Sequence, residues 1–229
     1  MAWNVSFDVR AGQICGLIGP NGAGKTTLFN CLSRLYQAGA GTIDFAGERL
    51  LQLPRHRVAR LGIGRTFQNL ALFETMSVRD NVLIGGHCRG RSGFVANALC
   101  LPIVWREERL LSERATGLLE MLELTAIADV PVSALPFWKR KRVELARALA
   151  SEPKLLLLDE PAAGLDHADL GELGRLIVNI RDRLGITILL VEHHMSLVLS
   201  ISDQVVVLDF GRTIAEGPTS PSNSPITPI

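Results

Sequence analysis

The fold is decided by residues 19–27, Gly19-Pro20-Asn21-Gly22-Ala23-Gly24-Lys25-Thr26-Thr27. This stretch matches the pattern G-x-x-x-x-G-K-[ST], and it follows an apolar run, Ile14 to Ile18, that is typical of a buried strand. Leucines at helical spacing follow it, at positions 28, 32 and 35. Glycines let consecutive backbone N–H groups turn around phosphate oxygens, and the start of a helix adds a positive dipole. The stretch therefore predicts a phosphate-binding loop between a strand and a helix.

Two side chains of this loop have the chemistry that a nucleoside triphosphate and its metal ion require. Lys25 is expected to neutralise the β- and γ-phosphates, and the Thr26 hydroxyl is expected to take one Mg²⁺ position. The remaining loop residues, from Gly19 to Thr27, are expected to line the nucleotide, so the predicted ligands are ATP and Mg²⁺. The structural alternative is an ordinary glycine-rich turn between a strand and a helix.

Further short apolar runs predict a mostly parallel sheet of buried strands covered by helices, an α/β fold. These runs are Leu155 to Leu158, Ile186 to Val191 and Val205 to Leu208. Between the first strand and these runs, residues 42–67 alternate in short segments among glycines and predict a small β-rich insertion. Residues from about 77 to 135 have helical spacing and predict a helical subdomain. Prolines and serines crowd residues 218–229, which predicts a disordered tail.

Acidic and imidazole side chains follow two of these runs. Asp159 and Glu160 come directly after Leu155 to Leu158, and His193 follows the next strand along the chain. Parallel strands end at the same edge of a sheet, so Asp159 is expected to hold Mg²⁺ through water and Glu160 to orient or deprotonate the attacking water. His193 is expected within reach of the γ-phosphate, although a lone histidine is more often a cap or a surface residue.

Composition excludes several classes of protein. The chain has 229 residues, 47% of them hydrophobic, which is enough to bury a sizeable core. Its 24 Lys and Arg against 23 Asp and Glu give a net charge of +1, so nucleic acid is not the expected partner. Its four cysteines form no C-x-x-C pair, and its most apolar stretch is shorter than a membrane span, so a cytosolic location is expected.

Together these motifs resemble the ATP-binding subunit of an ABC transporter, from about Asn4 to Gly217. Thr66-Phe67-Gln68-Asn69 resembles the Q-loop, in which Gln68 would contact Mg²⁺ and the nucleophilic water. Gly164-Leu165-Asp166 resembles the D-loop, and Val191-Glu192-His193 resembles the segment that carries the switch histidine. The resemblance assigns catalytic roles to Glu160, His193 and Gln68, and metal roles to Thr26, Gln68 and Asp159.

The resemblance also implies a fold, a substrate class and partners. It implies a P-loop NTPase core of RecA-like type, about 1–76 and 136–217, with a small antiparallel β subdomain and a helical subdomain. Arg65-Thr66-Phe67-Gln68 is most similar to subunits that energise import of branched-chain amino acids. Such a subunit is peripheral on the cytoplasmic face of the inner membrane. Its partners would be permease subunits, a second ATP-binding subunit and, indirectly, a substrate-binding protein.

One segment departs from the family pattern. A signature of the type Leu-Ser-Gly-Gly-Gln caps the γ-phosphate held by the opposite subunit, and the corresponding run here is Leu135-Pro136-Phe137-Trp138-Lys139. Trp138 replaces a glycine where backbone must approach phosphate closely. Two hypotheses remain: an active ATPase subunit, or a nucleotide-binding partner that is nearly inactive because its signature is degenerate. A soluble ATPase acting on nucleic acid is disfavoured by the near-zero net charge.

Overall fold

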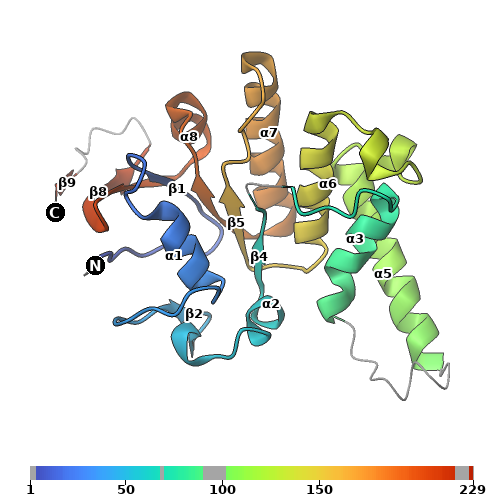
Figure 1. Cartoon of the computed structure of the whole chain (residues 1–229), viewed down its shortest axis with the longest axis horizontal. Helices are drawn as coiled ribbons and strands as arrows, with labels where there is room; N and C mark the ends of the chain where they lie inside the picture. Colours follow the sequence, from blue (N-terminus) through green and yellow to red (C-terminus); the bar gives the residue numbers. More distant parts are fainter. Residues whose placement is uncertain (1–3, 68–69, 90–101, 220–226, 229) are drawn as a thin grey trace. The chain divides into compact units, whose positions relative to one another are not determined.

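The computed structural model describes residues 4–67, 70–89, 102–219 and 227–228. The chain divides into two compact units (Figure 1), one of Met1–Gln68 with Lys154–Ile229 and the other of Asn69–Pro153. Each unit is described by itself below. No helix among the described residues is long and apolar enough to cross a membrane.

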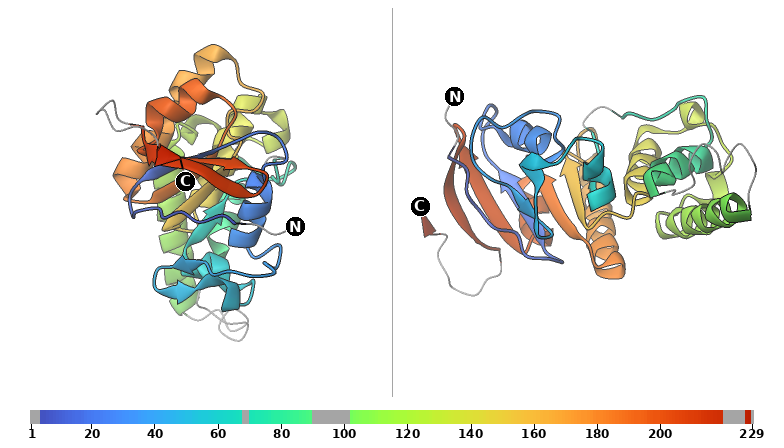
Figure 2. Two further views of the ribbon diagram at one scale, coloured as in Figure 1. Left: turned by 90° about the vertical axis from the view of Figure 1, so that its left-hand side faces the viewer. Right: turned by 90° about the horizontal axis from the view of Figure 1, so that it is seen from below.

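The first unit is built on a seven-stranded sheet with the order β4-β5-β6-β1-β7-β8-β9. The strands from β4 to β7 run parallel, and β8 and β9 continue the sheet antiparallel. Figure 2 shows the strands side by side in two further views. Their bounds are β1 Ile14–Ile18, β4 Ile63–Arg65, β5 Leu155–Asp159, β6 Thr187–Val191, β7 Gln204–Asp209, β8 Arg212–Pro218 and β9 Thr227–Pro228. The predicted α/β fold with a mostly parallel sheet is confirmed.

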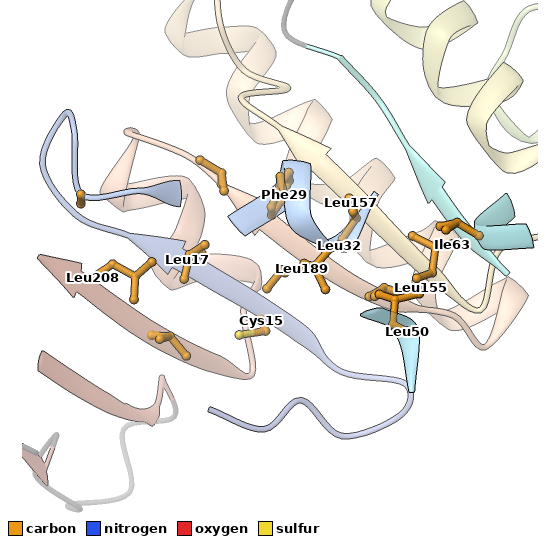
Figure 3. Close-up of a cluster of buried hydrophobic side chains, with 14 residues drawn as sticks. Cys15, Leu17, Phe29, Leu32, Leu50, Ile63, Leu155, Leu157, Leu189 and Leu208 are labelled. Atoms are coloured by element: carbon orange, nitrogen blue, oxygen red, sulfur yellow. The ribbon is translucent and has the colours of Figure 1, made fainter. Parts of the chain in front are cut away.

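Helices cover both faces of this sheet. On one face, α1 (Lys25–Leu32) buries Phe29 and Leu32 against alternate residues of the strands, such as Leu157 and Leu189 (Figure 3). On the other face, α7 (His167–Leu184) packs with α8 (Met195–Ile201). A Cβ at Gly16 would lie 2.5 Å from Val198 of α8, so that helix approaches β1 closely.

The predicted β-rich insertion, residues 42–67, is only partly separate from the main sheet. Its antiparallel pair consists of β2 (Asp44–Phe45) and β3 (Glu48–Arg49), followed by the turn η1 (Leu50–Gln52) and the helix α2 (Arg57–Leu61). Ile63–Arg65, which we assigned to the insertion, instead forms β4 and pairs in parallel with Leu155–Leu157. Ile63 and Gly64 are buried there, and that burial requires a covered strand rather than a small exposed ribbon.

The second unit is helical. It contains α3 (Val78–Gly86), α5 (Pro102–Met121) and α6 (Phe137–Leu149), with the short turns η2 (His87–Arg89), η3 (Thr125–Ile127) and η4 (Val132–Ala134). We expected a helical subdomain from about 77 to 135 and assigned α6 to the core. The structure groups α6 with α3 instead, because a Cβ at Gly85 would lie only 2.1 Å from the carbonyl oxygen of Arg147. Such a close approach joins the two helices.

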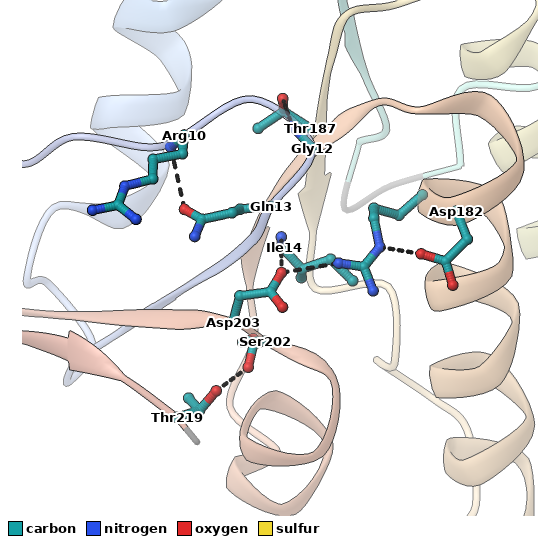
Figure 4. A network of polar contacts seen from close by, with 10 residues as sticks. Arg10, Gly12, Gln13, Ile14, Asp182, Thr187, Ser202, Asp203 and Thr219 are labelled. Atoms are coloured by element: carbon teal, nitrogen blue, oxygen red, sulfur yellow. Dashed lines mark hydrogen bonds and ion pairs between the residues drawn. The ribbon is translucent and has the colours of Figure 1, made fainter. Parts of the chain in front are cut away.

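Charged and polar side chains fix the end of the sheet at which β1 begins (Figure 4). Asp203 Oδ2 accepts hydrogen bonds from the Ile14 amide at 2.8 Å and from Arg181 Nη1 at 3.1 Å.

Most of the tail predicted to be disordered, 218–229, lies outside the described residues. Within it, Thr227–Pro228 pairs with Ala215 and Glu216 as β9.

Candidate functional site

The loop that follows β1 lies against the turn between β7 and β8. A Cβ at Gly19 would lie 2.0 Å from the carbonyl oxygen of Leu208, so only glycine fits there. The Gly211 amide donates to Ala23 O at 2.9 Å, and the Ala23 amide donates to Pro20 O at 3.1 Å. These contacts hold the loop in one shape without using the amides of its remaining residues.

Those remaining amides are available to a ligand. The first helical hydrogen bond of α1 runs from Leu28 N to Gly24 O, at 2.9 Å. Among the described residues, the amides of Gly22, Gly24, Lys25, Thr26 and Thr27 have no acceptor. A concave run of free N–H groups at a helix start is the arrangement that binds phosphate oxygens.

The side chain of Lys25 is bonded to the backbone of the loop itself. Its side-chain nitrogen, Nζ, donates to Gly19 O at 2.7 Å and to Pro20 O at 3.0 Å, and the residue is only 6% exposed. Burial lowers the pKa of the Lys25 ammonium, and the negative charges of Glu160 and Asp159 partly offset that effect. Both carboxylates therefore act on Lys25 electrostatically, and this links the C-terminal end of β5 to the loop.

The structure brings Glu160 and His193 into contact. His193 Nε2 lies 2.9 Å from Glu160 Oε1, and the side chains are 45% and 20% exposed respectively. Glu160 adopts a left-handed backbone conformation with φ 49°, and its amide donates to Val191 O at 2.9 Å. A non-glycine residue held in this conformation is a local strain of the kind that collects at functional sites.

The end of β6 contributes a residue that sequence reasoning named only as part of a motif. Glu192 is 2% exposed, and its two carboxylate oxygens accept from the amides of Ala162, at 2.6 Å, and of His193, at 3.0 Å. This buried carboxylate ties the turn after Glu160 to the segment that carries His193. A charged residue directly after four buried apolar positions was the signal available in the sequence.

Asp159, the predicted metal ligand at the end of β5, has a protein partner. Its Oδ2 lies 2.9 Å from Arg65 Nη2, in an ion pair whose side chains are 5% and 8% exposed. Sequence reasoning quoted Arg65 but gave it no role, because nothing in the sequence shows that β4 lies beside β5. Of the other predicted metal ligands, Thr26 is exposed at the start of α1, and Gln68 lies outside the described residues.

No cluster of three or more histidine, cysteine or acidic side chains among the described residues could by itself hold a metal ion. The donor set nevertheless fits Mg²⁺ bound together with a nucleotide, since such a site takes one hydroxyl, one carboxylate and phosphate oxygens. The free amides of the loop fit the phosphates. The residues present therefore fit both predicted ligands.

The segment with the atypical signature opens α6 in the helical unit. Pro136 O accepts from the amides of Lys139 and Arg140, each at 3.1 Å. The Trp138 side chain is exposed, and its ring lies 5.3 Å from Lys139 Nζ and 5.3 Å from the Arg142 guanidinium. Two cations of its own helix thus lie close to the indole ring.

The parallel sheet, the phosphate loop and the paired carboxylate and histidine define a P-loop ATPase. The ABC transporter family model matches residues 3–163, and the chain belongs to this family. It is an ATP-binding cassette, the ATPase of such a transporter.

Similar proteins cover nearly the whole chain. The high-affinity branched-chain amino acid transport ATP-binding protein BraF of Pseudomonas aeruginosa is 42% identical over 93% of this chain and 84% of its own length. The corresponding protein LivG of Escherichia coli K12 is 40% identical over 97% of this chain and 88% of its own. A solved ATP-binding cassette of an ABC transporter in its ADP conformation is 33% identical, with a TM-score of 0.80, over 93% of this chain and 83% of that one.

Proposed function

We propose that this cassette hydrolyses MgATP to drive import of branched-chain or other hydrophobic amino acids. The support for the substrate class is that BraF and LivG, named for branched-chain amino acid transport, match the chain at 42% and 40% identity. The observation that carries the proposal of ATP hydrolysis is the contact of 2.9 Å between Glu160 and His193. Each of these residues follows one of two neighbouring parallel strands.

In the proposed reaction Glu160 accepts a proton from a water molecule. That water attacks the γ-phosphorus, the bond from γ-phosphorus to the bridging oxygen breaks, and ADP leaves with the bonding electrons. Lys25 and the free loop amides stabilise the charge on the phosphates. His193 orients Glu160 through its Nε2 and donates a hydrogen bond toward the γ-phosphate.

The metal site is part of the same proposal. Thr26, Asp159 and Gln68 would hold Mg²⁺, which neutralises phosphate charge and orients the triphosphate. Thr26 stands at the start of α1, and Asp159 ends β5 next to Glu160.

The proposed partners are inner-membrane permease subunits, a second ATP-binding subunit and, indirectly, a substrate-binding protein. With them the cassette would lie on the cytoplasmic face of the inner membrane. Support for a permease contact comes from Phe73, whose side chain is 49% exposed. Asn81 brackets its backbone, accepting from Phe73 N at 2.9 Å and donating to Phe73 O at 3.0 Å, so the ring is presented from a fixed turn.

The test is Glu160→Gln, which keeps the size of the side chain and removes the base. ATP turnover is expected to fall by about 10² or more, while a fluorescent ATP analogue still binds. Glu172→Gln, a change of the same kind on the exposed side of α7, is the matched control and is expected to turn over as the parent. Unchanged turnover in Glu160→Gln would assign the base to another residue.

A second candidate function is a nucleotide-binding subunit with little activity of its own. The observation that favours it is Trp138 at the first turn of α6, where a glycine would leave the backbone open to a phosphate of the partner subunit. In a head-to-tail pair the damage falls on the site whose phosphate loop belongs to the partner. A homodimer would then have two damaged sites, and a heterodimer with an intact partner would keep one.

Trp138→Gly tests this candidate. In the homodimer, restored access of backbone N–H groups to phosphate is expected to raise turnover strongly, since each such donor contributes about 3 kcal/mol in a site without water. Trp105→Gly removes another exposed indole of the helical unit and is the control. If Trp138→Gly turns over ATP as the parent does, while Glu160→Gln behaves as expected, the degenerate-site hypothesis is wrong.

A further inference from the structure

Arg65 connects three elements around the phosphate loop. Its Nη2 donates to Asp159 at the end of β5, at 2.9 Å. Its Nη1 donates to Asn30 Oδ1 at 2.8 Å and to Ser33 Oγ at 3.1 Å, at the C-terminal end of α1. The guanidinium therefore joins β4, on which it stands, to β5 and to the helix that begins at the loop.

Aromatic rings complete the surroundings of this guanidinium. Its central carbon lies 5.6 Å from the Phe29 ring centroid and 5.1 Å from that of Phe67. Cation–π contacts of this kind favour a positive charge at the position where the ion pair also needs one. The ion pair is almost fully buried, in contrast to Arg79–Asp129, whose side chains are 36% and 83% exposed. Solvent therefore screens the charge of Arg65 only weakly at Asp159.

Hydrogen bonds at Thr66, the residue after Arg65, also join this segment to β5. The Thr66 amide donates to Leu157 O at 3.0 Å, and the Asp159 amide approaches Thr66 Oγ1 at 3.4 Å. The chain next to Arg65 is thus bonded to the strand that ends in Asp159. A shift of the segment after β4 would move the guanidinium and the carboxylate together.

A carboxylate that accepts from a guanidinium carries less free negative charge for a second cation. A fixed positive charge beside it also repels a divalent ion, with little screening at this depth. These two effects act in the same direction at Asp159, the residue to which we assign part of the Mg²⁺ site.

We propose that Arg65 is a positioning residue that acts through Asp159. It holds the carboxylate in place and lowers the affinity of the site for the divalent cation. The proposal rests on the proposed function, in which Asp159 helps to bind Mg²⁺. Its consequence is that the cation is held mainly through the nucleotide.

The experiment measures binding of Mn²⁺ to the purified full chain saturated with a non-hydrolysable ATP analogue, by electron paramagnetic resonance of the free ion. Arg65→Gln removes the charge, and its amide can still donate to Asp159. It is expected to bind Mn²⁺ about tenfold more tightly than the parent. Arg65→Lys keeps the charge and is expected to stay within about threefold of the parent.

The matched control is Arg34→Gln, which removes one positive charge from the same unit at a residue whose Nε donates to the backbone of Leu53. It is expected to bind Mn²⁺ as the parent does. A purely structural role for Arg65 would weaken or leave unchanged the binding of Mn²⁺ by Arg65→Gln, and either result would overturn the proposal. Thr26→Ala distinguishes a failure of this proposal from a failure of the proposed metal site. If this variant binds Mn²⁺ as the parent does, the proposed metal site itself is wrong.

A measurement on the unaltered chain covers the case in which Arg65→Gln does not fold. The guanidinium ¹⁵N resonances of Arg65 are assigned by their loss in Arg65→Lys. Addition of Mg²⁺ to the analogue-bound protein is expected to shift them, because the cation and the guanidinium act on one carboxylate. Resonances that stay unchanged at saturating Mg²⁺ would overturn the proposal.

Discussion

Gly19→Ala is expected to damage both stability and nucleotide binding, through contact with a strand on the far side of the loop. The added Cβ would lie 2.0 Å from Leu208 O and 3.1 Å from the carbonyl carbon of the same residue. A Cβ essentially never lies within 3.0 Å of a heavy atom to which it is not bonded, so the loop or β7 must move by about 1 Å. The obstacle is backbone in the middle of a sheet, which cannot rotate away as a side chain would.

The size of the effect follows from comparison with Gly22→Ala. Both glycines have positive φ, 149° and 82°, but a Cβ at Gly22 has no atom within 4 Å. Gly22→Ala is therefore expected to cost only the strain of an unusual backbone conformation, about 1 kcal/mol. Gly19→Ala adds a steric overlap of the kind that costs up to about 3 kcal/mol in packed interiors. The difference between the two variants is the quantity to measure.

Two measurements test this reasoning. Denaturant unfolding is expected to give Gly19→Ala a free energy of unfolding about 2 kcal/mol or more below that of Gly22→Ala. Titration with a fluorescent ATP analogue is expected to show binding weakened more than about tenfold in Gly19→Ala, because displaced loop amides lose hydrogen bonds to phosphate. Equal stability and equal affinity of the two variants would refute the close approach of Gly19 to β7.

Three further predictions use other parts of the molecule. Lys25→Ala is expected to abolish binding of the ATP analogue, because the phosphates lose their main counter-charge; binding as tight as in the parent would exclude the loop from the mechanism. Phe73→Ser is expected to leave the fold intact and to weaken co-purification with permease subunits, whereas unchanged association would indicate that the ring serves internal packing. Burial raises the pKa of the Cys15 thiol to about 12, so the folded state keeps a proton that the unfolded state loses above about pH 9. The stability of the parent relative to Cys15→Ala is therefore expected to fall by about 1.4 kcal/mol per pH unit between about pH 9 and 12, in unfolding measured at several pH values.

The sequence predicted those parts of the site that depend on local order along the chain. Residues 19–27 follow a strand and open a helix, and this order alone dictates a loop whose amides face outward. The sequence also predicted Glu160 and His193 at one edge of the sheet, because both follow parallel strands, but their contact depends on the pairing of β5 with β6.

What the sequence could not predict depends on neighbours in space. Ile63–Arg65 is too short and too close to glycines to be distinguished from a small ribbon, and only its pairing with Leu155–Leu157 makes it part of the main sheet. The partner of Asp159 follows from that pairing, since Arg65 ends the strand beside β5. The grouping of α6 with α3 depends on neighbours for a similar reason, because their close approach is set by Gly85, far away in the sequence.

The pair formed by Glu160 and His193 is held by backbone contacts on both sides, which explains how a strained residue can keep its position. Glu160 donates its amide to Val191 O, and the buried carboxylate of Glu192 binds the amides of Ala162 and His193. The turn after β5 is thus joined to the end of β6 and the residue after it at two points, Glu160 to Val191 and Ala162 to Glu192. A left-handed conformation at Glu160 persists only where its surroundings impose it, and these two hydrogen bonds supply that constraint. Glu192 therefore belongs to the geometry of the site even though it need not touch the nucleotide.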